Sequence, residues 1–349
     1  MLLASVRATT ALWFLLCAAQ PPYPDLPAPV SNNAVAAATR NGEIVILSAL
    51  GIGPKRTYEA ITNTAYLLKL GKANTWEVLP GIPGPGRLAA SAVGVGGRFL
   101  VFGGYTVASD GKETSLPNVD ILDPATKTWS RGTDIPVPID DSVAVVYRDR
   151  YVYLISGWSQ TNNVRNVQVY DAEKNRWEEA TPIRGVPVFG HAGGIVGNTI
   201  IYVDGAYKNP RGRGPKYIAS DECWSGAISP EDHRTIRWIR MPSHPGKARY
   251  RIAAGSGNGL VYFVGGTDNP YNYDGTGYDS RPSLPSATIF AWDQKRQRWQ
   301  TLPDDERPSM DHRGLVGTES KLMLVGGMYS DQRVSPAVKL ISLRSSSQQ

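Results

Sequence analysis

The sequence predicts an all-β propeller, a ring of six similar units with four strands each. Two repeated sequence features predict this fold. Six short apolar runs end in a residue pair whose second member is glycine, and a single tryptophan follows five of them. The pairs are Leu50-Gly51, Gly103-Gly104, Ser156-Gly157, Asp204-Gly205, Gly265-Gly266 and Gly326-Gly327, and the tryptophans are Trp76, Trp129, Trp177, Trp238 and Trp299. The second glycines of successive pairs are 48 to 61 residues apart.

Composition supports a fold built from hairpins. The 349 residues include 36 glycines, 26 prolines, 17 tyrosines and 9 tryptophans, and they show no long helical periodicity. Length alone would suggest two domains, but the repeat indicates one. We expect a single propeller over residues 21–345, followed by a tail at 346–349. Its units span approximately 33–87, 88–139, 140–190, 191–247, 248–309 and 310–343, the last completed by 23–30.

The second unit shows the expected order of strands most clearly. Residues 89–95 form the first strand, Gly96-Gly97 the turn and residues 98–102 the second strand. Residues 119–124 form the third strand, and Trp129 lies at the fourth. A large ring at this position can cover the gap between two sheets, so we expect the tryptophans to pack between neighbouring blades.

The sixth unit ends one strand short, because no tryptophan strand follows residues 337–343. Residues 23–30 near the N-terminus resemble the Leu-Pro stretches that follow Trp76 and Trp299. We therefore predict that residues 23–30 supply the outer strand of the last blade and close the ring, which removes an exposed sheet edge.

Residues 1–20 are typical of a signal peptide, with Arg7, an apolar core centred on residues 11–17 and small residues after it. The apolar stretch is too short for a stable membrane span. We expect an exported protein, periplasmic or secreted.

Removal of this leader would leave Cys223 as the single cysteine. We favour the interpretation of Cys223 as a small buried hydrophobic side chain over that of a reactive thiol. Since no Cys/His cluster has zinc spacing, neither a metal nor a cofactor is expected.

The net charge of +6 is spread thinly along the chain. Its densest basic stretch comprises Lys208, Arg211, Arg213 and Lys216 in a loop rich in glycine and proline. That loop lacks the length and interleaved aromatics of a nucleic-acid surface, so we expect no nucleic-acid partner. An anionic small ligand and a solvated loop remain the two interpretations.

Propeller geometry places two sets of positions on one rim of the channel: the residues that begin the first strands, and those that follow the glycine pairs. Arginine can hold a carboxylate through two hydrogen bonds, and aromatic faces can stack on a sugar ring. An acidic sugar or glycan is therefore the expected ligand. The alternative is that these polar groups pair with one another and with water. The rim candidates for ligand binding are Arg87, Arg251, Arg313, Tyr105 and Trp158.

The longest insertions, residues 207–224 and 268–286, lie in the fourth and fifth units. The second is rich in tyrosine, asparagine and aspartate, which are common in carbohydrate recognition, although a turn-rich Ω-loop is an equal interpretation. These insertions add Tyr207, Arg211, Asp268 and Tyr271 as ligand-binding candidates.

The glycine pairs and the period of about 50 residues resemble kelch repeats. Together with the leader, the Leu-Pro segment and the enlarged fourth and fifth units, they resemble the exported N-acetylneuraminate epimerases, the sialic-acid mutarotases. That resemblance implies cofactor-independent mutarotation of an acidic sugar. It also implies a catalytic glutamate directly after Gly205, where this chain has Ala206, and an arginine that Arg211 or Arg213 could match.

If the chain is catalytic, proton transfer must come from other rim residues. His191 is the first candidate, Asp141 or Asp311 could orient it or replace it, and His312 is the alternative. A hydrogen bond from His191 to a backbone carbonyl is the competing interpretation. The alternative function is a non-catalytic propeller that binds carbohydrate or protein.

Overall fold

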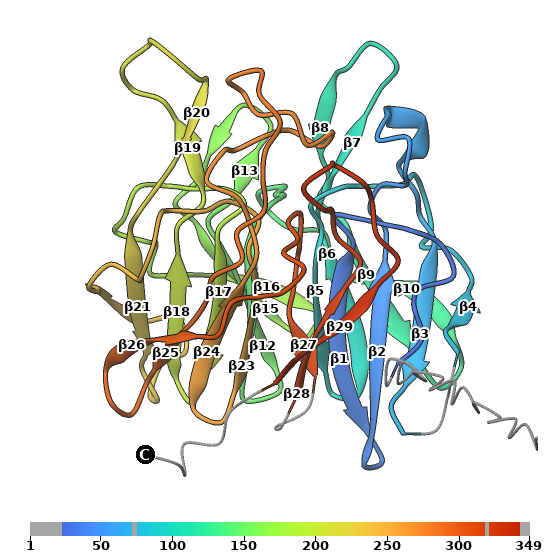
Figure 1. The fold of residues 1–349 in the computed structure, drawn as a ribbon. Helices are drawn as coiled ribbons and strands as arrows, with labels where there is room; N and C mark the ends of the chain where they lie inside the picture. Colours follow the sequence, from blue (N-terminus) through green and yellow to red (C-terminus); the bar gives the residue numbers. More distant parts are fainter. Residues whose placement is uncertain (1–22, 72–74, 318–320, 343–349) are drawn as a thin grey trace, which may run out of the picture.

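The computed structural model describes residues 23–71, 75–317 and 321–342 and shows an all-β propeller (Figure 1). The predicted leader at residues 1–20 lies outside the described residues. The single helix in the described ranges is a 3-10 turn, Tyr58–Ala60. In these ranges no helix has the length and apolar character needed to cross a membrane.

Five sheets have four antiparallel strands, each with its first strand at the channel. They are β1 (Ala34–Arg40), β2 (Glu43–Ala49), β3 (Ala65–Lys69), β4 (Glu77–Leu79); β5 (Ser91–Val95), β6 (Arg98–Phe102), β9 (Val119–Asp123), β10 (Thr128–Arg131); β11 (Val143–Tyr147), β12 (Tyr151–Ile155), β15 (Val167–Asp171), β16 (Arg176–Ala180); β17 (Ala192–Val196), β18 (Thr199–Val203), β21 (Cys223–Ile228), β22 (Ile236–Arg240); and β23 (Ala253–Gly257), β24 (Leu260–Val264), β25 (Ile289–Asp293), β26 (Arg298–Leu302).

Among the described residues the sixth sheet has three strands, β27 (Val316–Gly317), β28 (Lys321–Val325) and β29 (Val338–Ser342). The prediction of six four-stranded blades is therefore wrong at the sixth unit. Residues 23–30 do lie against this sheet, but as irregular chain and not as a strand. Leu26 donates its N–H to the carbonyl of Pro336 at 2.8 Å, ahead of β29. Prolines at positions 24, 27 and 29 lack the N–H groups that a regular ladder needs.

Both residues of every glycine pair have positive φ, for example 64° and 87° at Asp204 and Gly205. A Cβ on the second residue would lie under 3.0 Å from a neighbouring atom in all six units, so only glycine fits there. In three units the first residue of the pair is not glycine, and there Leu50, Ser156 and Asp204 have positive φ. This conformation ends each second strand and turns the chain onto the rim.

The five repeated tryptophans join neighbouring units, as predicted. Each indole N–H donates to a backbone carbonyl of the preceding segment at 2.8 to 3.1 Å. The acceptors are Pro24, Pro80, Thr133, Thr181 and Pro242. Trp177 also packs edge-on against Phe102 of the second blade, with ring centroids 5.9 Å apart. The rings therefore belong to the interfaces between blades.

Extra strands rise from one end of the propeller, beyond the glycine pairs (Figure 1). They are β7 (Tyr105–Val107) with β8 (Glu113–Ser115), β13 (Trp158–Ser159) with β14 (Asn162–Asn163), and β19 (Ala206–Lys208) with β20 (Tyr217–Ala219). The long loop of residues 268–286 lies at the same end. We call this end the loop face.

Candidate functional site

Six residues with positive φ surround the mouth of the channel on the loop face, one at the start of each unit. They are Asn32, Ala89, Asp141, Gly190, Arg251 and Asp311, with φ between 51° and 66°. Backbone hydrogen bonds connect four of the six consecutive pairs; for example, Gly190 donates to Asp141 at 2.9 Å and Arg251 donates to Gly190 at 2.7 Å. The shared conformation brings side chains from distant units together at the channel mouth.

Arg251 is the centre of a buried ion network at this mouth. Its guanidinium donates to Asp141 at 2.9 Å and to Asp311 at 3.0 Å. Arg313 forms a second ion pair with Asp141. Burial acts to raise the pKa of Asp141, but the two arginines outweigh it and hold that pKa below its usual value. The predicted ligand-binding arginines 251 and 313 therefore already pair with carboxylates.

A small pocket of about 40 Å³ lies above this network. Its walls are largely aromatic and come from blades 2 to 5: Tyr105, Trp158, Phe189, Tyr217, Tyr250 and Tyr278. Glu113, Asp140, Asp141, Asn272 and Arg251 supply its polar groups. Of the predicted ligand-binding residues, Tyr105, Trp158 and Arg251 line this pocket. We call it the rim pocket.

Asp140 is the most unusual titratable group of the rim pocket. It is buried, and burial followed by repulsion from Asp141 raises its pKa well above the usual value. One carboxyl oxygen accepts a hydrogen bond from the Ser115 hydroxyl. Asp140 and Asp141 are adjacent in the chain, yet their environments move their pKa values in opposite directions. A pair of this kind can supply a proton donor beside an ionised carboxylate.

The loop of residues 268–286 covers the rim pocket. The Asn272 carbonyl accepts a 2.6 Å hydrogen bond from Arg251, and its side-chain amide donates to Glu113 at 2.6 Å. Tyr278 packs against Tyr217 with ring centroids 4.7 Å apart. Gln332 Nε2 donates to the Ser283 carbonyl at 2.9 Å. The loop thus crosses from the fifth unit to the second, fourth and sixth.

His191 and His312 lie below the rim pocket, in a channel cavity of about 400 Å³ lined by first-strand residues of all six units. Burial is the main cause that lowers the pKa of each to about 3. His312 bonds the Ser309 hydroxyl at 2.9 Å. Neither nitrogen of His191 has a well-formed hydrogen bond to a described residue. Both imidazoles are therefore neutral, and His191 lies near enough to Arg313 and Asp141 for the first to lower its pKa and the second to raise it.

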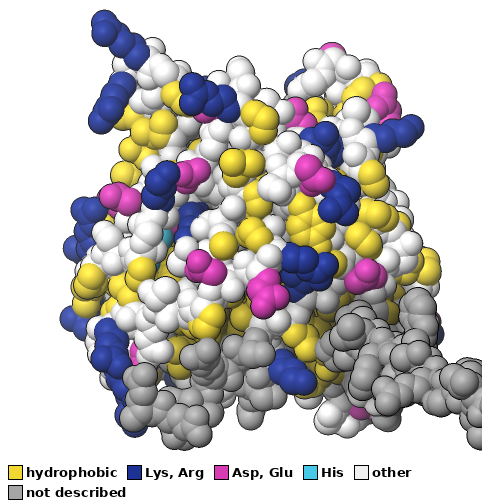
Figure 2. Space-filling view, viewed as in Figure 1, with side chains coloured by type: hydrophobic (Ala, Val, Ile, Leu, Met, Phe, Trp, Pro, Cys, Tyr) yellow, Lys and Arg dark blue, Asp and Glu magenta, His cyan; other side chains and the backbone are white. Residues whose placement is uncertain are grey.

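The other candidates lie elsewhere. Arg87 pairs with Asp120 of β9 at 2.6 Å, inside the second blade. Tyr207 and Arg211 belong to the β19–β20 arm, where basic side chains gather at the tip (Figure 2). Asp268 pairs with Lys247 at 2.7 Å. Tyr271 is buried beneath Arg251, whose guanidinium carbon is 5.3 Å from its ring centroid. The structure does not bring these five side chains together.

Ala206 is fully buried in β19, and its carbonyl accepts hydrogen bonds from Phe189 and Asn163. Its neighbours in the core include Phe189, Tyr217 and Tyr250. A carboxylate at this position would thus be enclosed by aromatic rings.

Sequence reasoning missed several lining residues. Tyr217, Tyr278 and Glu113 lie on arms whose folding back over the channel no local pattern reveals. The sequence shows Asp140 next to Asp141, but the raised pKa of Asp140 results from its burial, which only the structure reveals. A second group, Asp204, Cys223 and His244, comes from segments 19 to 40 residues apart and was also not predicted as a site.

Comparison with known proteins identifies the repeat. The profile of the KLHDC2/KLHL20/DRC7 Kelch-repeats domain matches residues 35–266, more than half of the chain. The chain belongs to the kelch-repeat family. The kelch assignment agrees with the glycine pairs and the sheet order described above.

Several curated kelch proteins are similar in sequence. Kelch-like protein 15 of Mus musculus is 23% identical over 273 residues, which cover 76% of this kelch chain and 43% of the relative. Kelch domain-containing protein 3 of Homo sapiens is 25% identical over 238 residues, 63% of this chain and 58% of the relative. The chain thus spans less than two thirds of these relatives.

A solved structure, that of YjhT, has the same fold. It superposes with a TM-score of 0.75 at 17% sequence identity and covers 93% of this kelch chain and 98% of its own. At this identity the similarity concerns the fold alone.

Proposed function

We propose that this kelch propeller is exported and binds a sugar in the rim pocket. The observation that carries the sugar proposal is the convergence of aromatic rings from four blades with carboxyl, amide and guanidinium groups in one concave site. Aromatic faces pack on the apolar faces of sugar rings, and the polar groups bond their hydroxyls. Export is inferred from residues 1–20, and secretion of the full chain with cleavage near Ala19 tests it.

An acidic sugar such as N-acetylneuraminate is the first ligand to test, because of the resemblance to the sialic-acid mutarotases. Arg251 is the cation that lines the rim pocket, and its Nη1 group bonds the Asn272 carbonyl. A sugar carboxylate would replace that carbonyl. The free volume of about 40 Å³ is smaller than a sugar, so binding requires residues 268–286 to move outward.

Binding is measured by titration calorimetry with N-acetylneuraminate and, in parallel, with neutral N-acetylglucosamine. Trp158→Ala should weaken binding at least 10-fold, since stacking on an aromatic ring is lost. Tyr207→Ala is the matched control, because Tyr207 lies on an arm outside the rim pocket. If Tyr207→Ala weakens binding and Trp158→Ala does not, the site is on the arm instead. Equal affinity for both sugars would reject selectivity for the acidic one.

Mutarotation is a second candidate function, favoured by Asp140. A carboxyl with a raised pKa keeps its proton to higher pH than a free carboxyl and can donate it to a ring oxygen. Exchange NMR of the two anomers of the bound sugar tests this. Asp140→Asn should reduce the exchange rate at least 100-fold and leave affinity within about threefold. An unchanged rate in that variant, or no acceleration by the wild type, would leave binding without catalysis.

Protein binding is the remaining candidate. A groove of about 420 Å³ between β20 and residues 268–286 exposes Leu284, whose side chain is 58% accessible. Leu284→Asp should abolish capture of a protein partner and leave sugar binding unchanged.

A further inference from the structure

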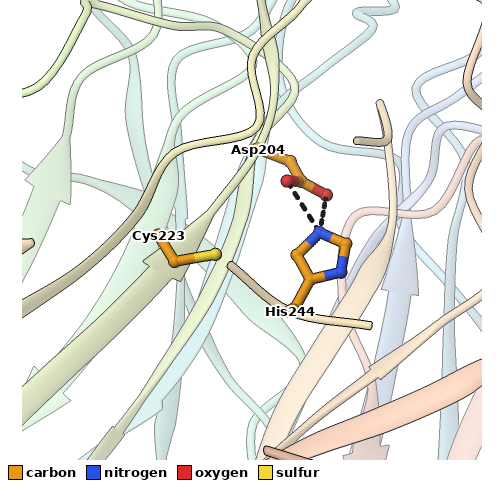
Figure 3. Close-up of side chains that lie close together, drawn as sticks. All are labelled: Asp204, Cys223 and His244. Atoms are coloured by element: carbon orange, nitrogen blue, oxygen red, sulfur yellow. Dashed lines mark hydrogen bonds and ion pairs between the residues drawn. The ribbon is translucent and has the colours of Figure 1, made fainter. Parts of the chain in front are cut away.

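Three buried side chains with metal-binding atoms converge between the fourth and fifth blades (Figure 3). Asp204 follows β18, Cys223 begins β21 and His244 lies between β22 and β23. Their ligand atoms all lie within 4.8 Å of one another. All three side chains are at most 6% exposed. This cluster is distinct from the rim pocket, since none of its members lines that pocket.

The imidazole of His244 is oriented as in many metal sites. Nδ1 donates to the Pro245 carbonyl at 2.8 Å, which fixes the tautomer and directs Nε2 toward Asp204. Nε2 lies 2.9 Å from both carboxylate oxygens. The ring also stacks on Phe290 with centroids 4.2 Å apart. Because both ring nitrogens face acceptors, one proton is shared between His244 and Asp204.

The cluster does not have the geometry of a nucleophilic triad. Nε2 of His244 faces Asp204, so it is not available to deprotonate Cys223. Burial is the main cause that raises the pKa of the Cys223 thiol to about 12, and the carboxylate of Asp204 adds to it. The thiol therefore stays protonated unless a cation arrives to replace its proton.

We propose that Asp204, Cys223 and His244 form a binding site for a divalent transition metal, with zinc as the best match. Their carboxylate, thiolate and imidazole groups are the three ligand types that zinc prefers. In a tetrahedral zinc site, ligand atoms are about 3.5 Å apart. Nε2 and the carboxylate would separate by about 0.5 Å, and the sulfur would move in by up to about 1.3 Å. Three protein ligands leave the fourth position of a tetrahedral site to another donor.

Metal binding would release two protons to solvent, one from the Cys223 thiol and one from between His244 and Asp204. The backbone N–H of Arg249 donates to Asp204 Oδ2 at 3.0 Å and holds that carboxylate in place. The bound ion would tie β18 and β21 to the segment that leads into the fifth blade.

The test uses the full chain with Cys17→Ser, so that Cys223 is the single thiol. The protein is dialysed against a metal-free buffer and then titrated with Co²⁺ and with Zn²⁺. We expect one equivalent of metal, a thiolate-to-cobalt charge-transfer band and displacement of cobalt by zinc. Zinc at 100 times its Kd should raise Tm by about 3 to 6 °C. Wild-type protein with neither the band nor the Tm shift would overturn the proposal.

Cys223→Ser should abolish the charge-transfer band, and His244→Gln should lower cobalt affinity at least 100-fold. His191→Gln is the matched control, since it removes another buried histidine. This variant should keep both the charge-transfer band and the cobalt affinity of the wild type. Far-UV circular dichroism checks that each variant is folded. If the band persists in Cys223→Ser, or if His191→Gln alone removes it, the metal binds elsewhere and the proposal fails.

Discussion

The backbone N–H of Gly327 donates a 2.9 Å hydrogen bond to the carbonyl of Val30. The same position in the other five units donates to the segment that begins the next unit, for example Gly205 to Arg249 at 3.0 Å. The N-terminal segment therefore closes the ring through the same contact that joins all the other units, although it forms no strand.

Removal of this closure should destabilise the propeller. Leu26 and Val30 are each 4% exposed and pack against Val325 and Val338. Leu26→Ala should lower the free energy of unfolding by about 2 to 4 kcal/mol, through lost burial and the cavity left behind. Urea denaturation measures it. Val78→Ala, at a side chain 67% exposed, is the control and should change stability by less than about 0.5 kcal/mol. Equal midpoints for the two variants would contradict the closure.

Crowding at the second glycine can be separated from backbone strain. Gly205 and Gly197 have φ of 87° and 61°, so alanine is strained at both positions. A Cβ at Gly205 would lie 2.7 Å from Cβ of His191, whereas one at Gly197 would have nothing within 4 Å. Gly205→Ala should therefore cost about 1 to 3 kcal/mol more than Gly197→Ala. Thermal denaturation of both variants measures the difference, and equal losses would show that the contact is relieved without cost.

The ion network at the channel mouth should depend strongly on Asp141. Asp141→Asn leaves Arg251 with one carboxylate and Arg313 with none in the described network, and it should cost about 3 to 5 kcal/mol. Chemical denaturation at pH 7 provides the measurement. Asp331→Asn removes an exposed, solvent-screened pair with Arg333 and should change stability far less. A similar small loss in both variants would show that the network contributes little.

Mild acid should weaken the fold through His191 and His312. Their pKa values of about 3 lie below the value of about 6.5 expected in the unfolded chain. The unfolded chain therefore binds protons that the folded chain excludes, and stability falls as pH drops from 6.5 toward 3. Each histidine contributes about 1.4 kcal/mol per pH unit. Asp141 has a lowered pKa, so its contribution is lost only at more acidic pH.

Denaturation between pH 4.5 and 6.5 measures this slope. His191→Gln should reduce it by roughly half of the two-histidine contribution. Tyr202→Phe alters a ring 5.6 Å from His191 and keeps the imidazole, so its slope should equal that of the wild type. If the slope in His191→Gln matches the wild type, His191 is protonated in the folded protein.

The repeat could be read from the sequence because it is local. Each glycine pair marks a backbone conformation that few side chains allow, and each repeated tryptophan marks a gap between sheets, so strands, units and the rim follow from spacing. The partner of a charged side chain is not local. Arg251 and Asp141 are 110 residues apart, and which carboxylate the guanidinium meets depends on the ring as a whole.

The covering of the rim pocket was unpredictable for a related reason. Residues 268–286 contain the tyrosines and asparagines expected of a binding loop, yet the same side chains fill the pocket when the loop folds inward. Composition shows which groups are present, and only the fold shows whether they face a ligand or one another. Asp204, Cys223 and His244 show the opposite case. No sequence motif links these three residues, yet the packing of the blades brings them together.

The contact between Gly327 and Val30 has a consequence for how the chain is connected. Five of the six junctions between units are covalently continuous, and the sixth is held by the same kind of hydrogen bond without a peptide link. The junction between the sixth and the first unit is thus one of six equivalent places where the circle could be opened. A circularly permuted chain, with a peptide linker between the sixth and first units and an opening at another junction, should enclose the same channel.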